Sequence, residues 1–488
     1  MEDFLAKSLE LIIDRGTTMA KIILKNDISQ IVTTNETLAK FLYDNLRFRD
    51  RNYFHNRAYR QRIWDGFTNF FNKNNGKFLT GLLPEILMAC KAHKEEVQIL
   101  DQRTKVDFAV NEINSTFLHS CTPAGSPVIT LEDYQVDLVN SAIKNKRGVI
   151  FAPTSAGKSL TMLSILKCLP AGTKTLVLQN RKTLAIQNYE EYTKWGLHNV
   201  GRIWGGVDEP NDITVSTVQS ISKAADLLPE VEVLLVDEIH DMMSTAPKAV
   251  YRMLKKCSVR IAVSATPFKF GDSDKIQKFY VKGFFGPPFK IKSTETGIVT
   301  TQELQNRGRL SKSRCIFHKI NSPDLEYELY QDAVNLGIVE NNTLHEKVVE
   351  LATAQSGRTL ILVDRLAHGD TLQSLIPNAL WVQGKDNDET RKQVIEQLQK
   401  SENCIAIATQ GIFNTGINVF VHTLINAAGG QADHQIIQRM GRGLRTAKDK
   451  EELLYIDFIF ETNPYLHKHS MKRVKILQKQ GHSIEILD

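Results

Sequence analysis

The sequence alternates regularly between short apolar runs and longer amphipathic stretches. The first set of apolar runs occupies residues 148–153, 175–179, 233–238 and 260–267. Between them, residues 158–169 and 182–195 carry apolar positions at helical spacing. Because strands that alternate with helices are typical of parallel sheets, we predict an α/β domain for this part of the chain.

A second alternation of the same kind follows a break in the pattern. Residues 286–293, which read GPPFKIKS, interrupt the first rhythm. The later strand-like runs are residues 359–364, 379–384, 404–409, 423–429 and 453–460. We therefore predict two α/β domains in tandem, over residues 123–290 and 291–488.

The first 122 residues lack this alternation. Helical spacing is present around residues 35–47, and turn-punctuated segments lie around residues 64–83. Residues 121–130, CTPAGSPVIT, contain two prolines and a glycine and are typical of a linker. Residues 1–122 are therefore predicted to form a small α+β domain ahead of the other two.

Composition is that of an ordinary globular protein. The 488 residues are 42% hydrophobic and 24% charged, and the net charge of +6 permits an anionic partner without requiring one. The six cysteines lie far apart without a C-x-x-C pair, which argues against a zinc site or a disulfide framework. No stretch is long enough to cross a bilayer and no signal peptide is evident, so we expect a cytoplasmic protein.

The segment after the first predicted strand carries a phosphate-binding pattern. Residues 152–160, APTSAGKSL, match G-x-x-x-x-G-K-[ST] at Gly157, Lys158 and Ser159, with Ala152 in place of the first glycine. Gly157 allows the backbone to wrap around phosphate at a helix N-terminus. Lys158 is expected to reach the β- and γ-phosphates, and the Ser159 hydroxyl to bind Mg²⁺. The alternative is a chance G-K-S triplet in a loop.

Residues 234–241, LLVDEIHD, end an apolar run in two carboxylates and a histidine. Burying charge is costly, so acids at the end of a buried strand need a reason. We predict that this strand runs beside the phosphate-loop strand, with Asp237 holding Mg²⁺ and Glu238 positioning or deprotonating the attacking water. The alternatives are a solvated strand end and, for His240, a hydrogen-bonded loop histidine.

Together these motifs resemble the superfamily 2 helicases, whose further motifs follow in order between residues 125 and 445. The resemblance implies two RecA-like domains, use of ATP with Mg²⁺, and a nucleic-acid partner. It assigns nucleotide binding to Tyr134, Gln135, Pro153, Thr154, Ser155, Ala156, Gly157, Lys158 and Ser159. The segments at 177–187 and 214–219 resemble strand-contacting motifs, which assigns Arg181 and Thr217 to the nucleic acid.

The motifs that would join the two domains complete the resemblance. Coupling between nucleotide and strand is assigned to His240, Ser264, Thr266 and Gln438. The segment ATQGIFNTGIN, residues 408–418, assigns Thr409 to the strand, and Gly416 and Asn418 to the nucleotide. Asn418 departs from the family, which often has aspartate there, so its contact is expected to be weaker.

Two arginines in QRMGRGLR, residues 438–445, match the pattern Q-x-x-G-R-x-x-R. Arg442 and Arg445 are three residues apart and share one helical face. Carried by the second domain, they are expected to reach a γ-phosphate bound to the first, and such arginine fingers contribute ~10³–10⁵ in rate. Hydrolysis would then require the domains to close. A solvated basic helix is the alternative.

A basic segment stands out in the N-terminal domain. Residues 47–62, RFRDRNYFHNRAYRQR, contain six arginines and one acid. The aromatic residues between them are Tyr53, Phe54 and Tyr59. Arginine neutralises phosphates and aromatic rings stack on bases, which predicts DNA contacts by Arg57, Arg60 and Arg62. The alternative is a basic surface whose aromatic rings face a core.

The same segment, with Trp64-Asp65-Gly66 and KFLTGLLP at residues 77–84, resembles the phage recombination helicases of the UvsW type. That resemblance implies remodelling of branched DNA: unwinding of D-loops and R-loops, fork regression and branch migration. It also implies recombination or replication proteins as partners and, for a phage protein, the host cytoplasm.

The same motifs leave other functions open. An RNA helicase of the same superfamily, the motor of a restriction system and a non-hydrolysing binding module are the alternatives. The intact lysine, acids and arginines of the motifs argue against the last of these. The basic segment at residues 467–483 fits either a further DNA contact or a solvated helix.

Overall fold

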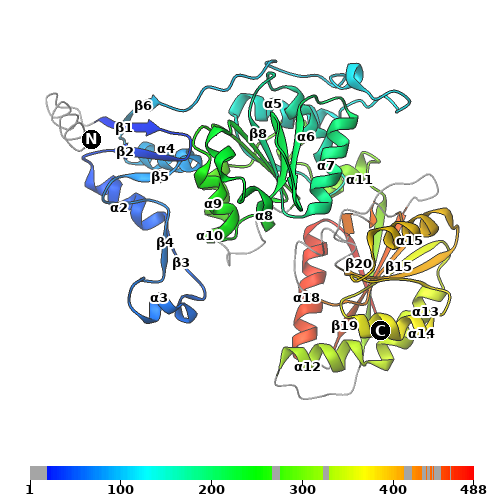
Figure 1. Cartoon of the computed structure of the whole chain (residues 1–488). Helices are drawn as coiled ribbons and strands as arrows, with labels where there is room; N and C mark the ends of the chain where they lie inside the picture. Colours follow the sequence, from blue (N-terminus) through cyan, green and yellow to red (C-terminus); the bar gives the residue numbers. More distant parts are fainter. Residues whose placement is uncertain are drawn as a thin grey trace. The chain divides into compact units, whose positions relative to one another are not determined.

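The structure, a computed structural model, describes most of the chain (Figure 1). The described residues are 19–265, 275–321, 329–410, 420–430, 436, 440–441, 443–444, 452–461 and 463–488. They form two compact units: the first contains residues up to 293 except 152–158, and the second contains residues 152–158 with residues 294–488. The division of the first unit into two domains remains a prediction.

A seven-stranded sheet, ordered β10-β9-β11-β8-β12-β13-β7, forms the centre of the first unit. Its strands are β7 (Arg147–Phe151), β8 (Thr175–Gln179), β9 (Val200–Trp204), β10 (Val207–Glu209), β11 (Ile213–Thr217), β12 (Val233–Asp237) and β13 (Val259–Ser264). All paired neighbours are parallel except β9 and β10. The predicted parallel α/β sheet is therefore confirmed.

One part of the predicted topology is wrong. Strand β12 does not run beside the phosphate-loop strand β7, because β13 lies between them and pairs with both. All six residues of β13 are buried, as a strand with neighbours on both sides and helices on both faces requires. Helical crossovers allow the chain to skip a position in the sheet, so sequence order does not set strand order.

Helices and short turns connect these strands. They are α5 (Asp133–Asn145), α6 (Lys158–Lys167), α7 (Lys182–Lys194), α8 (Val218–Ile221), η4 (Ala225–Glu230), η5 (Ile239–Asp241), α9 (Thr245–Met253) and α10 (Lys275–Phe285). Alternate residues of the strands, including Leu178 and Val236, pack with α8, α9 and α10 in one apolar core. The predicted helices at 158–169 and 182–195 correspond to α6 and α7.

The N-terminal part of the first unit is a four-stranded sheet, ordered β5-β2-β1-β6. Its elements are β1 (Met19–Leu24), β2 (Ile28–Val32), α2 (Glu36–Asn45), β5 (Lys77–Leu79), η2 (Thr80–Leu82), α4 (Leu83–Ala92) and β6 (Glu96–Asp101), and the turn η3 (His119–Cys121) follows in the segment that leads to α5. Phe279 and Tyr280 of α10 pack against its core. The buried Arg260 of β13 lies 3.1 Å from Asp27, which ties this sheet to the larger one.

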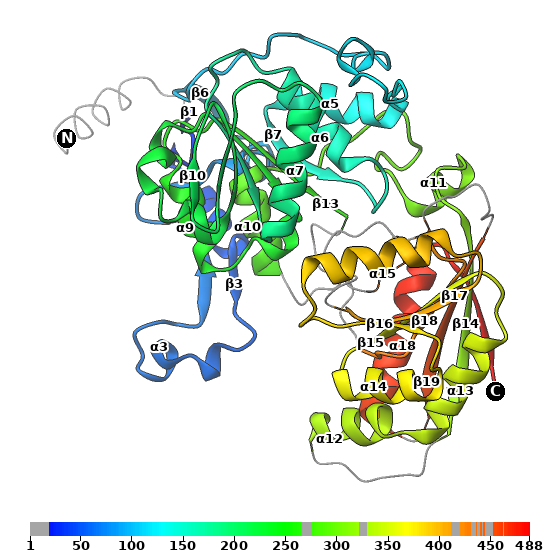
Figure 2. The same cartoon turned by 45° about the vertical axis from the view of Figure 1, so that its right-hand side comes forward.

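A narrow arm extends from the small sheet (Figure 2). A two-stranded ribbon of β3 (Arg47–Arg49) and β4 (Phe67–Asn69) forms its stem. Its tip contains η1 (Tyr53–His55) and α3 (Arg57–Arg60), and neither turn has a buried residue. The arginine-rich segment of the sequence is therefore an exposed projection.

The second unit is built on a parallel seven-stranded sheet, ordered β16-β17-β15-β18-β19-β14-β20. Its strands are β14 (Lys312–Ile320), β15 (Arg358–Val363), β16 (Leu380–Val382), β17 (Cys404–Thr409), β18 (Thr423–Asn426), β19 (Glu452–Phe460) and β20 (Ser483–Leu487). Its helical elements are α11 (Thr301–Asn306), α12 (Tyr330–Val334), η7 (Asn335–Val339), α13 (Asn342–Thr353), α14 (Leu366–Leu375), α15 (Asp388–Lys400) and α18 (Pro464–Lys479).

Helix α18 corrects one interpretation of the basic C-terminal segment. Seven of its residues are buried, among them Arg473, whose guanidinium lies 2.8 Å from the buried Asp457. The helix is therefore not simply solvated: one face packs on the sheet, and the lysines occupy the other.

Within the described part of the chain, no helix is long and apolar enough to span a membrane.

Candidate active site and nucleic-acid surface

The phosphate loop has a backbone suited to holding an anion. It leaves β7 through the buried Ala152 and Pro153 and enters α6 at Lys158. Ser155 and Gly157 have left-handed backbones, with φ of 68° and 76°. Alternating left- and right-handed residues turn successive N–H groups toward one point, which makes a concave anion site at a helix N-terminus. This geometry fits the phosphates of a nucleotide.

Three strands bring the predicted catalytic groups to one edge of the first sheet. The register pairs Asp237 of β12 with Val263 of β13, and Ser264 of β13 with Phe151 of β7. The strands therefore end at nearly the same level, and the loops that follow them share the carboxyl edge where ligands bind in such sheets. The hydroxyl of Ser159 and the carboxylate of Asp237 are oxygen donors of the kind that Mg²⁺ prefers.

The backbone at Glu238 is strained. Its φ of 48° and ψ of 55° place a non-glycine residue in the left-handed region. Its N–H donates to Asp237 Oδ1 at 2.9 Å, which helps to hold the turn. Such conformations cost about 1–3 kcal/mol and concentrate at functional sites. The turn directs Glu238 away from the strand path, immediately after the predicted metal ligand.

The charge of Asp237 affects the ionisation of a tyrosine on helix α7. The pKa of Tyr192 on α7 lies well above its ordinary value, because the phenol is buried and the charges of Asp237 and Glu191 disfavour the phenolate. Tyr192 is therefore a neutral phenol at any physiological pH.

A polar cluster fixes the Glu238 carboxylate. Ser264 Oγ donates to Glu238 Oε2 at 3.2 Å, and His240 Nδ1 lies 2.9 Å from the same hydroxyl. His240 Nδ1 is also 3.3 Å from Glu238 Oε2. The His240 side chain is 1% exposed and that of Glu238 19%, so the cluster runs from the interior to the edge of the site. The structure thus brings together two predicted coupling residues and the predicted catalytic glutamate.

The predicted adenine-recognition residues lie in the first turn of α5. Tyr134 and Gln135 are both buried. Gln135 Oε1 accepts the N–H of Glu132 at 2.9 Å and forms half of a capping box. The cap fixes the position of the amide that the helicase resemblance assigns to adenine.

The predicted nucleic-acid contacts of the sheets lie at strand ends. Arg181 is the N-cap of α7, two residues after the end of β8. Thr217 ends β11, but it is buried and its hydroxyl accepts the N–H of Ser220 as a helix cap. Thr409 is the last residue of β17 in the second unit. A phosphate contact by the Thr217 hydroxyl would have to share that cap.

The arm displays its arginines on a small aromatic framework. Tyr53 contacts Tyr59 with ring centroids 4.6 Å apart, and Arg49 lies over the Tyr53 ring at 4.4 Å. Phe54 is 51% exposed. The aromatic rings at the tip thus pack on one another instead of facing a core, and Arg57, Arg60 and Arg62 are exposed around them. This arrangement suits a surface that receives phosphates and bases.

Several predicted residues lie outside the described part of the chain. They are Thr266, Gly416, Asn418, Gln438, Arg442 and Arg445. Their predicted roles in coupling, nucleotide binding and transition-state stabilisation stay predictions.

Three polar residues next to the site were missed by sequence reasoning. Gln277 of α10 donates to the backbone carbonyl of His240 at 2.9 Å. Asn180 donates to Asp241 at 2.9 Å across 61 residues of sequence. Asn180 and Asp241 lie in the segments 177–187 and 234–241, but neither segment by itself indicates the bond.

The chain is similar to several known proteins. Residues 128–269 match the family described as "Type III restriction enzyme, res subunit". The DNA 3'-5' translocase XPB2 of Sulfurisphaera tokodaii is 26% identical over 363 residues, which cover 67% of this chain and 81% of that protein. The ATP-dependent DNA helicase uvsW of Enterobacteria phage T4 is 23% identical over 446 residues, which cover 86% of each.

A solved structure adds a match at the level of the fold. Dbp5 of S. cerevisiae, bound to RNA and ADP BeF3, matches with a TM-score of 0.52 at 15% identity, over 74% of this chain and 90% of that chain. The predicted architecture of tandem RecA-like domains is confirmed. The class predicted from the motifs is confirmed as well: the chain resembles the superfamily 2 helicases, enzymes that use ATP. Among these it resembles the UvsW helicases.

Proposed function

We propose that this chain is an ATP-dependent DNA helicase or translocase that remodels branched DNA. The observation that carries the proposal is that the first unit combines an acid-bearing sheet edge with an exposed arginine arm. Two relatives named above are a DNA translocase and a DNA helicase, which favours DNA as the substrate. Fork regression, branch migration and loop unwinding are activities in which such an arm would engage one branch while the motor moves along another.

In this proposal, the chain's own groups perform defined tasks. Lys158 and the N–H groups of the phosphate loop hold the triphosphate, and Ser159 and Asp237 hold Mg²⁺, which neutralises phosphate charge when bound. Glu238, held by Ser264, orients or deprotonates the water. Arg442 and Arg445 supply positive charge to the transition state when the two RecA-like domains close, which links hydrolysis to movement.

The arm supplies the proposed preference for branched DNA. Its arginines neutralise phosphates, and the exposed ring of Phe54 offers a stacking surface for an unpaired base. Proposed partners besides DNA are recombination or replication proteins, in the host cytoplasm if a phage encodes the chain.

The test is steady-state ATPase activity with single-stranded DNA, a four-way DNA junction, duplex DNA and RNA in parallel. Strong stimulation by the junction or the single strand, with little from RNA, is the expected result. Lys158→Ala should lose turnover while DNA binding survives, which serves as the control for contaminating ATPases. Stimulation by RNA alone would overturn the substrate and leave the ATPase assignment intact, whereas normal turnover in Lys158→Ala would overturn the phosphate-loop assignment.

A further inference from the structure

A hydrogen bond links two loops at the carboxyl edge of the first sheet. Asn180 follows β8 directly and precedes Arg181, the predicted nucleic-acid contact. Asp241 ends the short turn η5 that follows β12. Asn180 Nδ2 donates to Asp241 Oδ2 at 2.9 Å. The loop that carries Arg181 is therefore joined to the loop that carries Glu238.

The contact continues into the catalytic cluster. Asp241 Oδ1 lies 3.6 Å from His240 Nε2, on the edge of the ring opposite Nδ1. Nδ1 lies 2.9 Å from Ser264 Oγ, which donates to Glu238 Oε2. One carboxylate thus contacts both the asparagine beside Arg181 and the histidine beside Glu238. The result is a continuous path of polar contacts from Arg181's neighbour to the predicted catalytic group.

Burial indicates how the path would transmit a shift. The Asp241 side chain is 38% exposed, whereas that of His240 is 1% exposed and cannot turn without displacing its neighbours. Asn180 Oδ1 is buried and accepts no hydrogen bond within the described residues. The amide is therefore anchored through its Nδ2 bond to Asp241. A movement of Asn180 would alter the Asp241 carboxylate first and the His240 ring next.

We propose that Asn180 and Asp241 are positioning residues that make hydrolysis at Glu238 depend on nucleic acid at Arg181. The proposal rests on the proposed function. A phosphate that binds Arg181 would fix the start of α7, and Asn180 would then hold Asp241 in place. Asp241 in turn keeps His240 and Ser264 in the arrangement that orients the Glu238 carboxylate. Coupling between two sites in a protein typically changes the affinity at one of them by a factor of about 5–150.

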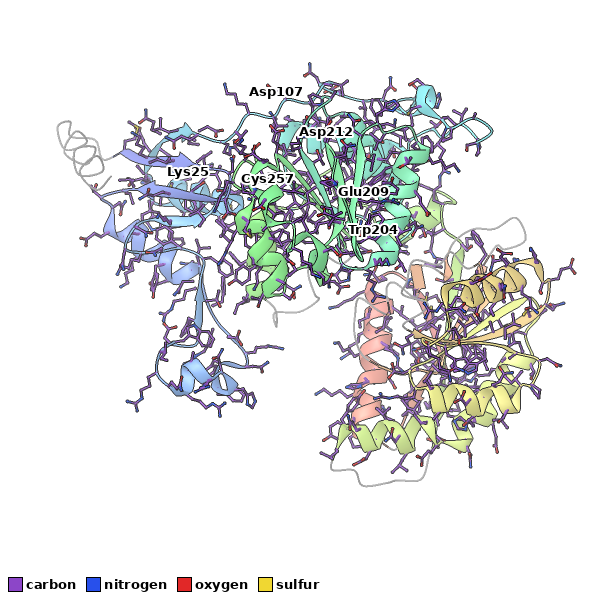
Figure 3. The ribbon with its side chains drawn as sticks, in the orientation of Figure 1. Lys25, Asp107, Trp204, Glu209, Asp212 and Cys257 are labelled. Carbon is purple, nitrogen blue, oxygen red and sulfur yellow. The ribbon has the colours of Figure 1, made fainter. Side chains whose placement is uncertain are left out.

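The same sheet offers a matched control at its opposite edge. Asn199 Nδ2 donates to Asp212 Oδ2 at 3.1 Å, an exposed pair of the same chemistry. Asn199 directly precedes β9 and Asp212 directly precedes β11, so the pair lies where these strands begin. Trp204 ends β9, and Figure 3 labels Asp212 and Trp204 toward opposite ends of the strands. Loss of the Asn199 bond should leave ATP hydrolysis and its dependence on DNA unchanged.

The experiment measures ATP turnover with and without a saturating oligo-dT strand. The variants are Asn180→Ala, Asp241→Ala, the double variant and Asn199→Ala, each checked for thermal unfolding and for binding of fluorescent oligo-dT. In the first two, the ratio of stimulated to DNA-free turnover should fall about fivefold or more, with the KM for ATP and the affinity for oligo-dT unchanged. In the double variant this ratio should fall no further than in either single variant, because both substitutions interrupt the same path.

Each other outcome overturns the proposal in a distinct way. Full stimulation in Asn180→Ala would show that the path carries no coupling. Weaker binding of oligo-dT in proportion to the lost stimulation would make Asn180 a nucleic-acid contact only. Additive losses in the double variant would make the two residues independent. If the unaltered chain is not stimulated by any DNA, the proposed function fails, and the coupling fails with it.

Discussion

The two seven-stranded sheets treat a carboxylate on a central strand in opposite ways. In the second unit, Asp457 lies within β19 and is 0% exposed. Arg473 donates to both of its oxygens, at 2.8 and 2.9 Å, and Asn426 and Tyr455 donate to it as well. In the first unit, Asp237 ends β12 and Glu238 follows it. The Glu238 side chain is 19% exposed.

The difference separates structural from functional charge. A carboxylate in the interior of a sheet is tolerable only if the protein itself supplies the compensating charge and hydrogen bonds. A carboxylate at the carboxyl edge remains accessible to a ligand, so a metal ion and a nucleotide can supply the compensating charge. Position along the strand therefore distinguishes a stabilising acid from a catalytic one, although the residue type is the same.

The largest expected effect on chemistry is at the edge carboxylate. Glu238→Gln should slow DNA-stimulated ATP turnover by roughly 10²–10⁴-fold, or about 3–5 kcal/mol in the barrier, because the amide cannot accept the proton of the water. Thermal unfolding should be unchanged. Single-turnover hydrolysis together with nucleotide binding checks this prediction, and turnover close to that of the unaltered chain would remove Glu238 from the reaction.

The interior carboxylate should show the reverse behaviour. Asp457→Ala should destabilise the second unit by about 3–5 kcal/mol, because it leaves the Arg473 guanidinium buried without its partner. Urea unfolding measures the loss. The double variant Asp457→Leu with Arg473→Met serves as the control, since removing both charges together should cost less than removing one. Equal destabilisation by all variants would show that packing, and not charge, dominates.

A smaller effect is expected from a histidine buried without compensation. Burial lowers the pKa of His368 to about 3, and the neighbouring His345 opposes its charge as well. The unfolded chain therefore binds a proton that the folded chain does not, so stability falls as the pH drops below about 6.5. The loss at pH 5 should be about 2 kcal/mol. Urea unfolding of His368→Leu across this pH range should lack that part of the decline, and an unaltered pH profile would contradict the assignment.

The smallest effect per residue is expected on the exposed arm. Replacing Arg57, Arg60 and Arg62 by alanine should weaken DNA binding and reduce the slope of log affinity against log salt by about 2–3, because each arginine displaces counterions from the DNA. The matched control replaces three exposed lysines of α18, Lys468, Lys472 and Lys475. An unchanged slope in the arm variant, with a reduced slope in the α18 variant, would move the DNA surface to the second unit.

Much of the fold could be predicted from local pattern. Strands β8 and β17 have the bounds of the predicted apolar runs: all five residues of β8 are buried, and the six residues of β17 are buried or half-buried. Strands β14 and β20 were missed: both carry charged or exposed positions among the apolar ones, so their sequences lack a continuous run. The position of β13 between β12 and β7 was also unpredictable, since the crossovers that set strand order leave no periodic signal.

The candidate site divides in the same way. The phosphate loop and the LLVDEIHD strand end are contiguous segments, so their chemistry can be predicted from the sequence. The bonds of Asn180 to Asp241 and of Gln277 to the His240 carbonyl join residues 61 and 37 positions apart. No property of any one segment indicates which distant side chain will complete its hydrogen bonds.

The sequence by itself determined which chemical groups stand at the end of which strand, because strand burial and loop chemistry are set within a few neighbouring residues. Only the tertiary structure decided what surrounds those groups. It placed Asp457 beside Arg473 in the interior and joined the loop of Arg181 to that of Glu238. The physical reason is that a hydrogen bond is made between atoms a few ångströms apart in space, and packing of the whole sheet sets that distance.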